Sequence, residues 1–222
     1  HLKELAELYS YNEELDFTAN RTSFEELMED YGYPLKWTQA LPGQRARVVE
    51  RLAEGLELTE RATRVRAIRA LLYLAQGNFA DCSTVEEQPR FARANIFTLY
   101  EYGIFPLLVQ LVHFEVEQAL KLSDGPPPAP IPTSSQSGSI TSLAPNDANS
   151  SLKLLVTIVY LFVLEMGRPV EAEDQEEALR QQQLRDRFKE ELMQPIAGEL
   201  LHLTLLELVI KLCQNTGVGA RF

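Results

Sequence analysis

The sequence has few of the residues from which catalytic and metal sites are commonly built. Its 222 residues include two cysteines and three histidines. Cys82 and Cys213 lie far apart, and neither belongs to a CxxC pair or a Cys/His cluster with metal-ligand spacing. We therefore expect cytosolic thiols rather than a disulfide framework or a zinc site. No catalytic residue, cofactor or metal site is predicted, and an enzyme is disfavoured.

Phosphate-binding glycine motifs and long apolar runs are missing as well. Neither GxGxxG nor GxxxxGK[ST] occurs in the chain, which disfavours a nucleotide enzyme. The longest apolar run without a charge, residues 154–164, falls short of the roughly 20 residues that a bilayer-spanning helix needs. We expect a cytoplasmic protein without a membrane span. The net charge of −11 disfavours a general electrostatic grip on nucleic acid or an anionic membrane, because counterion release requires a cationic surplus.

Apolar residues make up 45% of the chain, which is enough for a core without disulfides or metals, and their spacing is mostly helical. Residues 1–5 already read as an amphipathic helix, and Thr22-Ser23 predicts a new helix N-terminus before a stop at Gly32. Thr59 and Gly77 are predicted to cap the strongest helix. Predicted helices span residues 44–53 (closed near Gly55), 59–76, 86–102, 104–122, 152–166, 172–193 and 196–215. The sequence thus predicts an all-α fold, an irregular array of about eight or nine helices.

One composition break divides the chain. Residues 124–150 are rich in proline, serine and glycine and almost without charge, which predicts a flexible insertion or linker. Whether this segment separates two domains or interrupts one is open from composition alone. Because the flanking segments have similar helical character, we favour one helical domain, with residues 1–123 as its first part and 151–222 as its remaining helices.

Arginine is concentrated between residues 45 and 69 of this acidic chain, and this stretch is the best candidate for a binding site. The candidate contacts for an anion or an acidic partner are Arg45, Arg51, Arg61, Arg64, Arg66 and Arg69. The planar guanidinium suits such contacts because it can donate two parallel hydrogen bonds to a carboxylate or phosphate. The favoured alternative is internal neutralisation. The nearby acids are Glu50, Glu54, Glu57 and Glu60.

An ordered series of short segments carries a family resemblance. These segments are ELYSY at 7–11, ANR at 19–21, FEE at 24–26, KW at 36–37, RL at 51–52, GLE at 55–57, ALLYLAQG at 70–77 with Phe79 and Cys82, NIF at 95–97, Glu101-x-Gly103-x-Phe105 and the helix at 152–163. Together they resemble the N-terminal region of the striatin-interacting protein family, whose fungal members are the factor-arrest proteins. The Pro/Ser-rich segment departs from the family pattern.

The resemblance implies an all-helical, armadillo-like scaffold subunit of the STRIPAK assembly, without catalytic activity, in signalling and cell morphology. The implied partners are striatin, protein phosphatase 2A subunits and germinal-centre-type kinases. The family offers no short partner-contact motif, so no contact residue is carried over. Two alternatives stay open: a helical module that binds a polyanionic small ligand through the arginines, and a carboxylate-dependent hydrolase.

Overall fold

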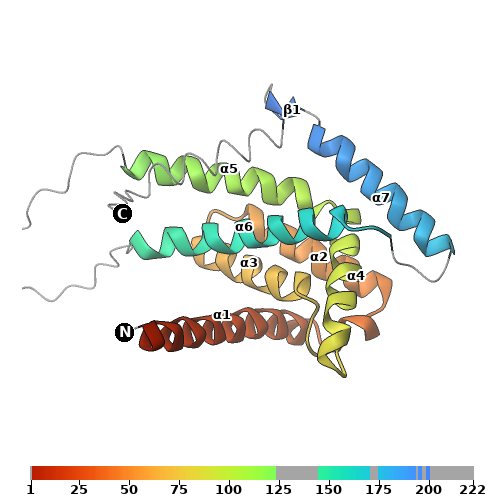
Figure 1. Ribbon diagram of the computed structural model, residues 1–222, viewed down its shortest axis with the longest axis horizontal. Coiled ribbons are helices and arrows are strands. Elements are labelled where there is room, and N and C mark those ends of the chain that lie inside the picture. Colours follow the sequence, from red (N-terminus) through yellow and green to blue (C-terminus); the bar gives the residue numbers. More distant parts are fainter. Residues whose placement is uncertain (1, 124–144, 171–174, 194, 197–198, 201–222) are drawn as a thin grey trace, which may run out of the picture.

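Seven α-helices and two short 3-10 helices make up nearly all of the chain that this computed structural model describes, which is residues 2–123, 145–170, 175–193, 195–196 and 199–200. The elements are α1 (Leu2–Asp30), η1 (Trp37–Gln39), α2 (Pro42–Glu57), α3 (Arg61–Ala75), η2 (Val85–Glu87), α4 (Gln88–Glu101), α5 (Ile104–Ser123), α6 (Pro145–Gly167) and α7 (Gln175–Met193) (Figure 1). One antiparallel pair, β1 (Pro195–Ile196) with β2 (Glu199–Leu200), follows α7. The predicted all-α class is confirmed.

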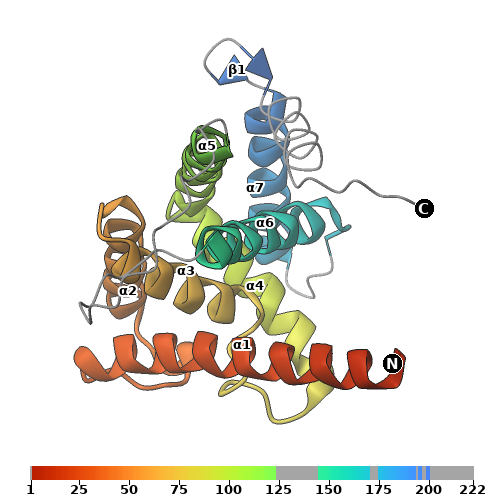
Figure 2. The ribbon, with the colours of Figure 1, turned by 90° about the vertical axis from the view of Figure 1, so that its left-hand side faces the viewer.

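Helix α3 occupies the centre of the molecule and packs against α1, α2, α4 and α6. Figure 2 shows α1 along one edge, α3 and α6 in the middle, and α5 and α7 on the opposite side. Helix α5 packs on α6 and α2, and α7 packs on α4 and α6. The armadillo-like arrangement implied by the resemblance stays a prediction.

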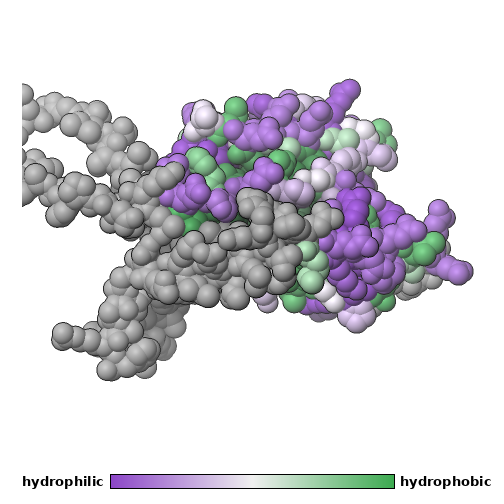
Figure 3. All heavy atoms as spheres, turned by 90° about the horizontal axis from the view of Figure 1, so that it is seen from above, coloured by the Kyte–Doolittle hydropathy of each residue, from purple (hydrophilic) through white to green (hydrophobic). Residues whose placement is uncertain are grey.

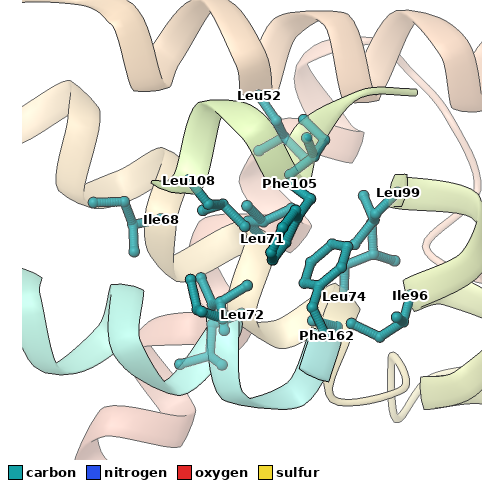
Figure 4. Packing of buried hydrophobic residues seen from close by; sticks show 14 of the residues in the cluster. Leu52, Ile68, Leu71, Leu72, Leu74, Ile96, Leu99, Phe105, Leu108 and Phe162 are labelled. Atoms are coloured by element: carbon teal, nitrogen blue, oxygen red, sulfur yellow. The ribbon is translucent and has the colours of Figure 1, made fainter. Parts of the chain in front are cut away.

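The core is built around the C-terminal half of α3, which is buried from Ala70 to Ala75. Its leucines meet Phe105 of α5 and Phe162 of α6 (Figure 4), whose rings lie 5.4 Å apart. This helix is therefore packed on more than one face. Burial of each such leucine or phenylalanine contributes about 1.5–3 kcal/mol, so the core readily offsets the few polar groups that it includes.

Helix α7 is the most polar element, and Figure 3 shows hydrophilic side chains gathered at the end of the molecule where it lies. It nevertheless packs onto the domain. Leu184 and Phe188 are buried, and the Phe188 ring lies 4.8 Å from that of Phe105. Leu179, by contrast, is exposed. Two buried apolar side chains about one helical turn apart therefore help to attach a helix whose other side chains are mostly polar.

Several predicted helix ends were wrong. Helix α1 continues through Thr22 and Ser23, because the Ser23 hydroxyl donates a hydrogen bond to the Ala19 carbonyl within the helix instead of capping a new one. Helix α3 begins at Arg61 rather than at Thr59. The helix expected at 196–215 lies mostly outside the described residues, and its described part, Ile196 and Glu199–Leu200, belongs to the β1–β2 pair.

The predicted end of α2 at Gly55 was also wrong. Gly55 is buried inside α2, which runs on to Glu57. A Cβ atom at Gly55 would lie 2.8 Å from the Cβ of Ala67 on α3. The glycine therefore permits a close crossing of α2 and α3, because any side chain there would force the two helices apart. Segment 124–144 of the predicted linker lies outside the described residues, and α6 begins at Pro145 within the predicted linker range.

Gly77 ends α3 as the sequence predicts, and replacing it by alanine is expected to lower the free energy of unfolding by about 3 kcal/mol. Its φ of +113° is costly for any residue with a Cβ, and that Cβ would lie 2.7 Å from the carbonyl oxygen of Gln88. Chemical denaturation measures the loss. Gly43→Ala is the control, because a Cβ there meets nothing within 4 Å. Equal stability of the two variants would contradict this account.

Tyr100 is expected to make the free energy of unfolding decrease with rising pH in the alkaline range. Burial raises the pKa of this phenol from 10.0 to about 12, although a hydrogen bond from Arg187 Nε partly opposes the shift. Unfolding above pH 10 therefore releases a proton, so the contribution of the neutral hydroxyl is complete below pH 10 and is lost as the pH rises through 12. We expect the stability of the native chain relative to Tyr100→Phe to fall by about 2–3 kcal/mol across that range. A constant difference in parallel denaturation series would refute the assignment.

Candidate functional site

The structure does not gather the six candidate arginines into one patch. Arg45 supports the loop before α2. Its guanidinium donates to the carbonyl oxygens of Trp37, Thr38 and Ala40 at 3.0–3.1 Å and lies 5.7 Å from the centroid of the Trp37 ring. These contacts use the planar donor fork within the chain.

Arg64 and Arg69 are held by acids and amides from distant segments. Arg69 donates to Asn20 Oδ1 at 3.1 Å and lies 3.4 Å from Asp16 Oδ1, so it ties α3 to α1. Arg64 lies 3.0 Å from Glu115 Oε1 of α5, with both side chains about nine-tenths buried, and also donates to the Leu58 carbonyl. These contacts favour internal neutralisation for both arginines.

Arg61 opens α3 and is half-buried, with its Nη2 making no hydrogen bond among the described residues. A positive side chain in the first turn of a helix is unfavourable toward the helix dipole. Helix α3 has no acidic residue in that turn to compensate, and the Glu60 side chain does not cap the helix. We find no internal role for this arginine.

Arg51 and Arg66 meet at a groove between α1, α2 and α3, with an empty volume of about 570 Å³. Its lining consists of Ser23, Glu26, Leu27 and Asp30 from α1, Arg51, Leu52 and Gly55 from α2, and Thr63, Arg66, Ala67 and Ala70 from α3. The floor is apolar and made largely of small residues. We call this site the α1–α3 groove.

The charges around the α1–α3 groove are separated by sign. Glu26 and Asp30, one helical turn apart, make the α1 side acidic, whereas α2 and α3 contribute the basic side chains Arg51 and Arg66. All four side chains are exposed. Among the described residues, only Arg51 of these four has a partner, an exposed ion pair with Glu54 at 3.0 Å. The groove therefore offers an acidic edge, an apolar floor and a basic edge, and its other three charges are available to a ligand.

A second groove lies between the end of α2, the start of α3 and α5, with an empty volume of about 790 Å³. Leu58 and Phe114 are its exposed apolar rim, and the guanidinium of Arg64 lies 5.6 Å from the centroid of the Phe114 ring. The inner apolar wall is made by Leu56, Leu107 and Leu111. Because Glu115 already binds Arg64, this groove is mainly an apolar surface.

Neither groove has the donor set of a metal centre. Within the described ranges no group of three or more His, Cys, Asp or Glu residues is placed to hold a metal ion. Glu26 and Asp30 share the α1–α3 groove, but both are exposed and no other polar side chain of the described residues orients them. What the groove supplies is a charged and apolar docking surface.

Among the described residues, no single helix has both the length and the apolar character needed to cross a membrane. Val85–Glu101 and Ile104–Gln118 would meet both demands only if taken together, and the chain bends by 84° between them.

Sequence reasoning found Arg51 and Arg66 but missed the acidic side of the groove. Neither Glu26 nor Asp30 was among the predicted site residues. Their spacing of four residues indicates that they share a helix face, yet only the packing of α1 on α3 shows that this face and the two arginines line the same groove.

Comparisons with known proteins place the chain in a family. The family model of the N1221-like proteins matches residues 1–220, so the chain belongs to the N1221-like family. Among its relatives are the striatin-interacting protein 1 homolog of Danio rerio, 33% identical over 96% of this chain, and human striatin-interacting protein 1, 34% identical over 96%. Human striatin-interacting protein 2 is 29% identical over 97%. The resemblance seen in the sequence is thereby confirmed.

The chain is short compared with these relatives. It covers 24% of the zebrafish protein, 23% of human striatin-interacting protein 1 and 24% of human striatin-interacting protein 2. It thus spans about a quarter of the length of the curated relatives that it matches.

Proposed function

We propose that this chain is a non-catalytic scaffold region that contributes protein–protein surfaces to a striatin-containing assembly of the STRIPAK type. The observation that carries the proposal is the family match over residues 1–220, together with relatives that are named for their interaction with striatin. In this role the chain acts in the cytoplasm, in signalling and cell morphology. Its partners are striatin, protein phosphatase 2A subunits and germinal-centre-type kinases.

The physical character of the chain supports a scaffold. A helical body with a continuous buried core presents its surface grooves in fixed positions, and fixed geometry lowers the entropic cost of binding a partner. We propose that residues 1–123 and 151–222 form one helical domain, because α3 from the first part and α6 from the second pack directly on each other.

The polyanion alternative is less well supported by the arrangement of charges. Arg45, Arg64 and Arg69 already have partners within the chain. The two arginines that share a groove face Glu26 and Asp30, which would repel a polyanion.

Association with purified partners tests the scaffold proposal. The chain and, as a positive reference, full-length human striatin-interacting protein 1 are mixed separately with purified striatin, with protein phosphatase 2A subunits and with a germinal-centre-type kinase, and stable complexes are detected by size-exclusion chromatography. We expect the chain to co-elute with at least one of these partners. Co-elution of the human protein without co-elution of the chain would reject the proposal for this chain. An unrelated helical protein of similar negative charge is the control.

A further inference from the structure

The α1–α3 groove has the features of a binding site for one particular kind of partner. We propose that it docks an amphipathic α-helix of a partner protein. The face of this helix that enters the groove, which we call its seam, carries small or medium apolar side chains. Acidic residues lie on one flank of the seam and basic residues on the other. This inference rests on the proposed scaffold function and assigns to it a surface and a partner chemistry.

The shape of the groove favours a helix lying on it. Each of the three helices presents a stripe of residues spaced three or four apart, such as Ser23, Leu27 and Asp30 on α1, and these stripes are ridges into which the side chains of another helix can fit. A whole helix is about 10 Å in diameter, so its seam enters the groove while its body stays outside. An extended strand is disfavoured because the groove walls are helices, which have no free backbone edge to pair with it.

The floor favours small and medium apolar anchors. Gly55, Ala67 and Ala70 project little into the groove, and the close crossing of α2 and α3 at Gly55 fixes the spacing of that floor. Leu27 and Leu52 complete it. Leu27 and Ala67 are part-exposed, whereas Leu52, Gly55 and Ala70 are already buried. An apolar side chain inserted there removes its own surface and that of Leu27 and Ala67 from water, which contributes roughly 25 cal/mol per Å².

The charges select what flanks the seam. A flank of Glu or Asp faces Arg51 and Arg66, where the guanidinium fork suits carboxylates, and a flank of Lys or Arg faces Glu26 and Asp30. A purely acidic or purely basic helix would satisfy one edge and be repelled by the other. Sign separation across one groove therefore supplies specificity more than raw affinity.

Designed helical peptides test the chemistry of the groove without any sequence from the assembly. Three fluorescent peptides share one alanine/leucine seam: the mixed peptide has Glu on one flank and Lys on the other, the acidic peptide has Glu on both, and the basic peptide has Lys on both. Fluorescence anisotropy measures their binding to the 222-residue chain. We expect the mixed peptide to bind at least tenfold more tightly than either uniform peptide. A mixed peptide with its two flanks exchanged cannot serve as a control. If it binds along the groove in the opposite direction, each flank again faces the groove edge of opposite charge.

Reversing the charges on one edge of the groove should change which of the three peptides binds most tightly. Arg51→Glu plus Arg66→Glu should weaken the mixed peptide at least tenfold and make the basic peptide the preferred one. Glu26→Lys plus Asp30→Lys should weaken the mixed peptide equally and favour the acidic peptide. All four positions are exposed, so folding should persist, and thermal melting followed by circular dichroism verifies it. The Glu26/Asp30 variant is still net negative, so a misfolded chain would not gain a preference for the acidic peptide, and that exchange is informative even if the variant is less stable.

Matched control variants distinguish the effect of the groove charges on peptide binding from the effect of the net charge of the chain. Lys36→Glu plus Arg90→Glu changes the net charge as the arginine pair does, and Glu14→Lys plus Glu190→Lys changes it as the acidic pair does. These four residues are exposed and lie outside the groove lining. We expect each control to change binding of the mixed peptide less than threefold. Changes as large as those of the groove variants would overturn the proposal.

Three further outcomes would overturn it. The first is that no peptide binds measurably, and the second is that the mixed and acidic peptides bind equally well to the native chain. The third is that tripolyphosphate raises the melting temperature of the native chain, has no such effect on the arginine variant and has a larger effect on the Glu26/Asp30 variant. The last would identify an anion site instead of a helix site. Because the peptides contain no partner sequence, their failure bears on the groove alone, whereas failed association with striatin, the phosphatase and the kinase bears on the proposed function.

Discussion

Replacing Asp81 by alanine should lower the free energy of unfolding by about 4 kcal/mol. This carboxylate is 8% exposed and accepts four hydrogen bonds. The donors are the backbone N–H groups of Trp37 and Thr38 at 3.2 and 3.0 Å, the Thr38 hydroxyl at 2.6 Å and Asn78 Nδ2 at 2.7 Å. It fastens the loop between α1 and α2 to the loop between α3 and α4. Alanine would leave the buried N–H of Trp37 without an acceptor and would remove one acceptor each from Asn78 Nδ2, which keeps its bond to the Leu35 carbonyl, and from the donors of Thr38, which water can reach.

The measurement is chemical denaturation followed by tryptophan fluorescence, since the chain has a single tryptophan, Trp37, at the affected site. Asp81→Asn keeps the shape and one acceptor oxygen, so its loss should be intermediate. Glu86→Ala, at an exposed position in the neighbouring η2, should change stability far less than Asp81→Ala does. An Asp81→Ala chain as stable as the Glu86→Ala chain would show that the four hydrogen bonds contribute nothing net.

The buried pair of Arg64 and Glu115 should give the second large effect. Either Arg64→Met or Glu115→Leu alone is expected to cost about 3–5 kcal/mol, because each leaves an uncompensated charge in the interior. Glu115 is also within 3.3 Å of the Ser151 hydroxyl, so its loss leaves a polar group on α6 without this acceptor. The pair thus links α3, α5 and α6 through one contact in the core.

The double variant should be much more stable than the sum of the two single losses predicts, since it removes both charges together. The coupling free energy from the double-mutant cycle should be at least about 1 kcal/mol and of stabilising sign for the native pair. The exposed pair of Arg51 and Glu54 has nearly the same 3.0 Å separation, and the same cycle there should give less than about 0.5 kcal/mol. Equal coupling in the two cycles would mean that burial does not set the strength of the Arg64–Glu115 contact.

The helical class and most helix positions were predictable because they depend on local periodicity. The buried run from Ala70 to Ala75 and the stop at Gly77 are properties of α3 alone. The errors at Ser23 and Gly55 arose where a residue type has two uses. A serine hydroxyl can cap a helix or bond within it, and a glycine can end a helix or permit a close crossing. Only the packed structure distinguishes these uses.

The candidate site was half predictable for a related reason. Sequence neighbours were expected to neutralise the arginines, but of those acids only Glu54 forms an ion pair with one of them among the described residues. The acids that bind Arg64 and Arg69 come from positions 51 and 53 residues away. Long-range pairing depends on which helices meet, and helical spacing within one segment carries no information about that.

The division of α3 into two halves has a consequence for divergence within a family. Its first half carries the exposed Arg66 and the part-exposed Thr63 at the groove, whereas its second half is buried in the core. Substitutions at Thr63 and Arg66 can therefore alter which helix is recognised while the body stays folded, and substitutions in the second half act on the body itself. Binding preference and structural integrity can evolve separately along a single helix.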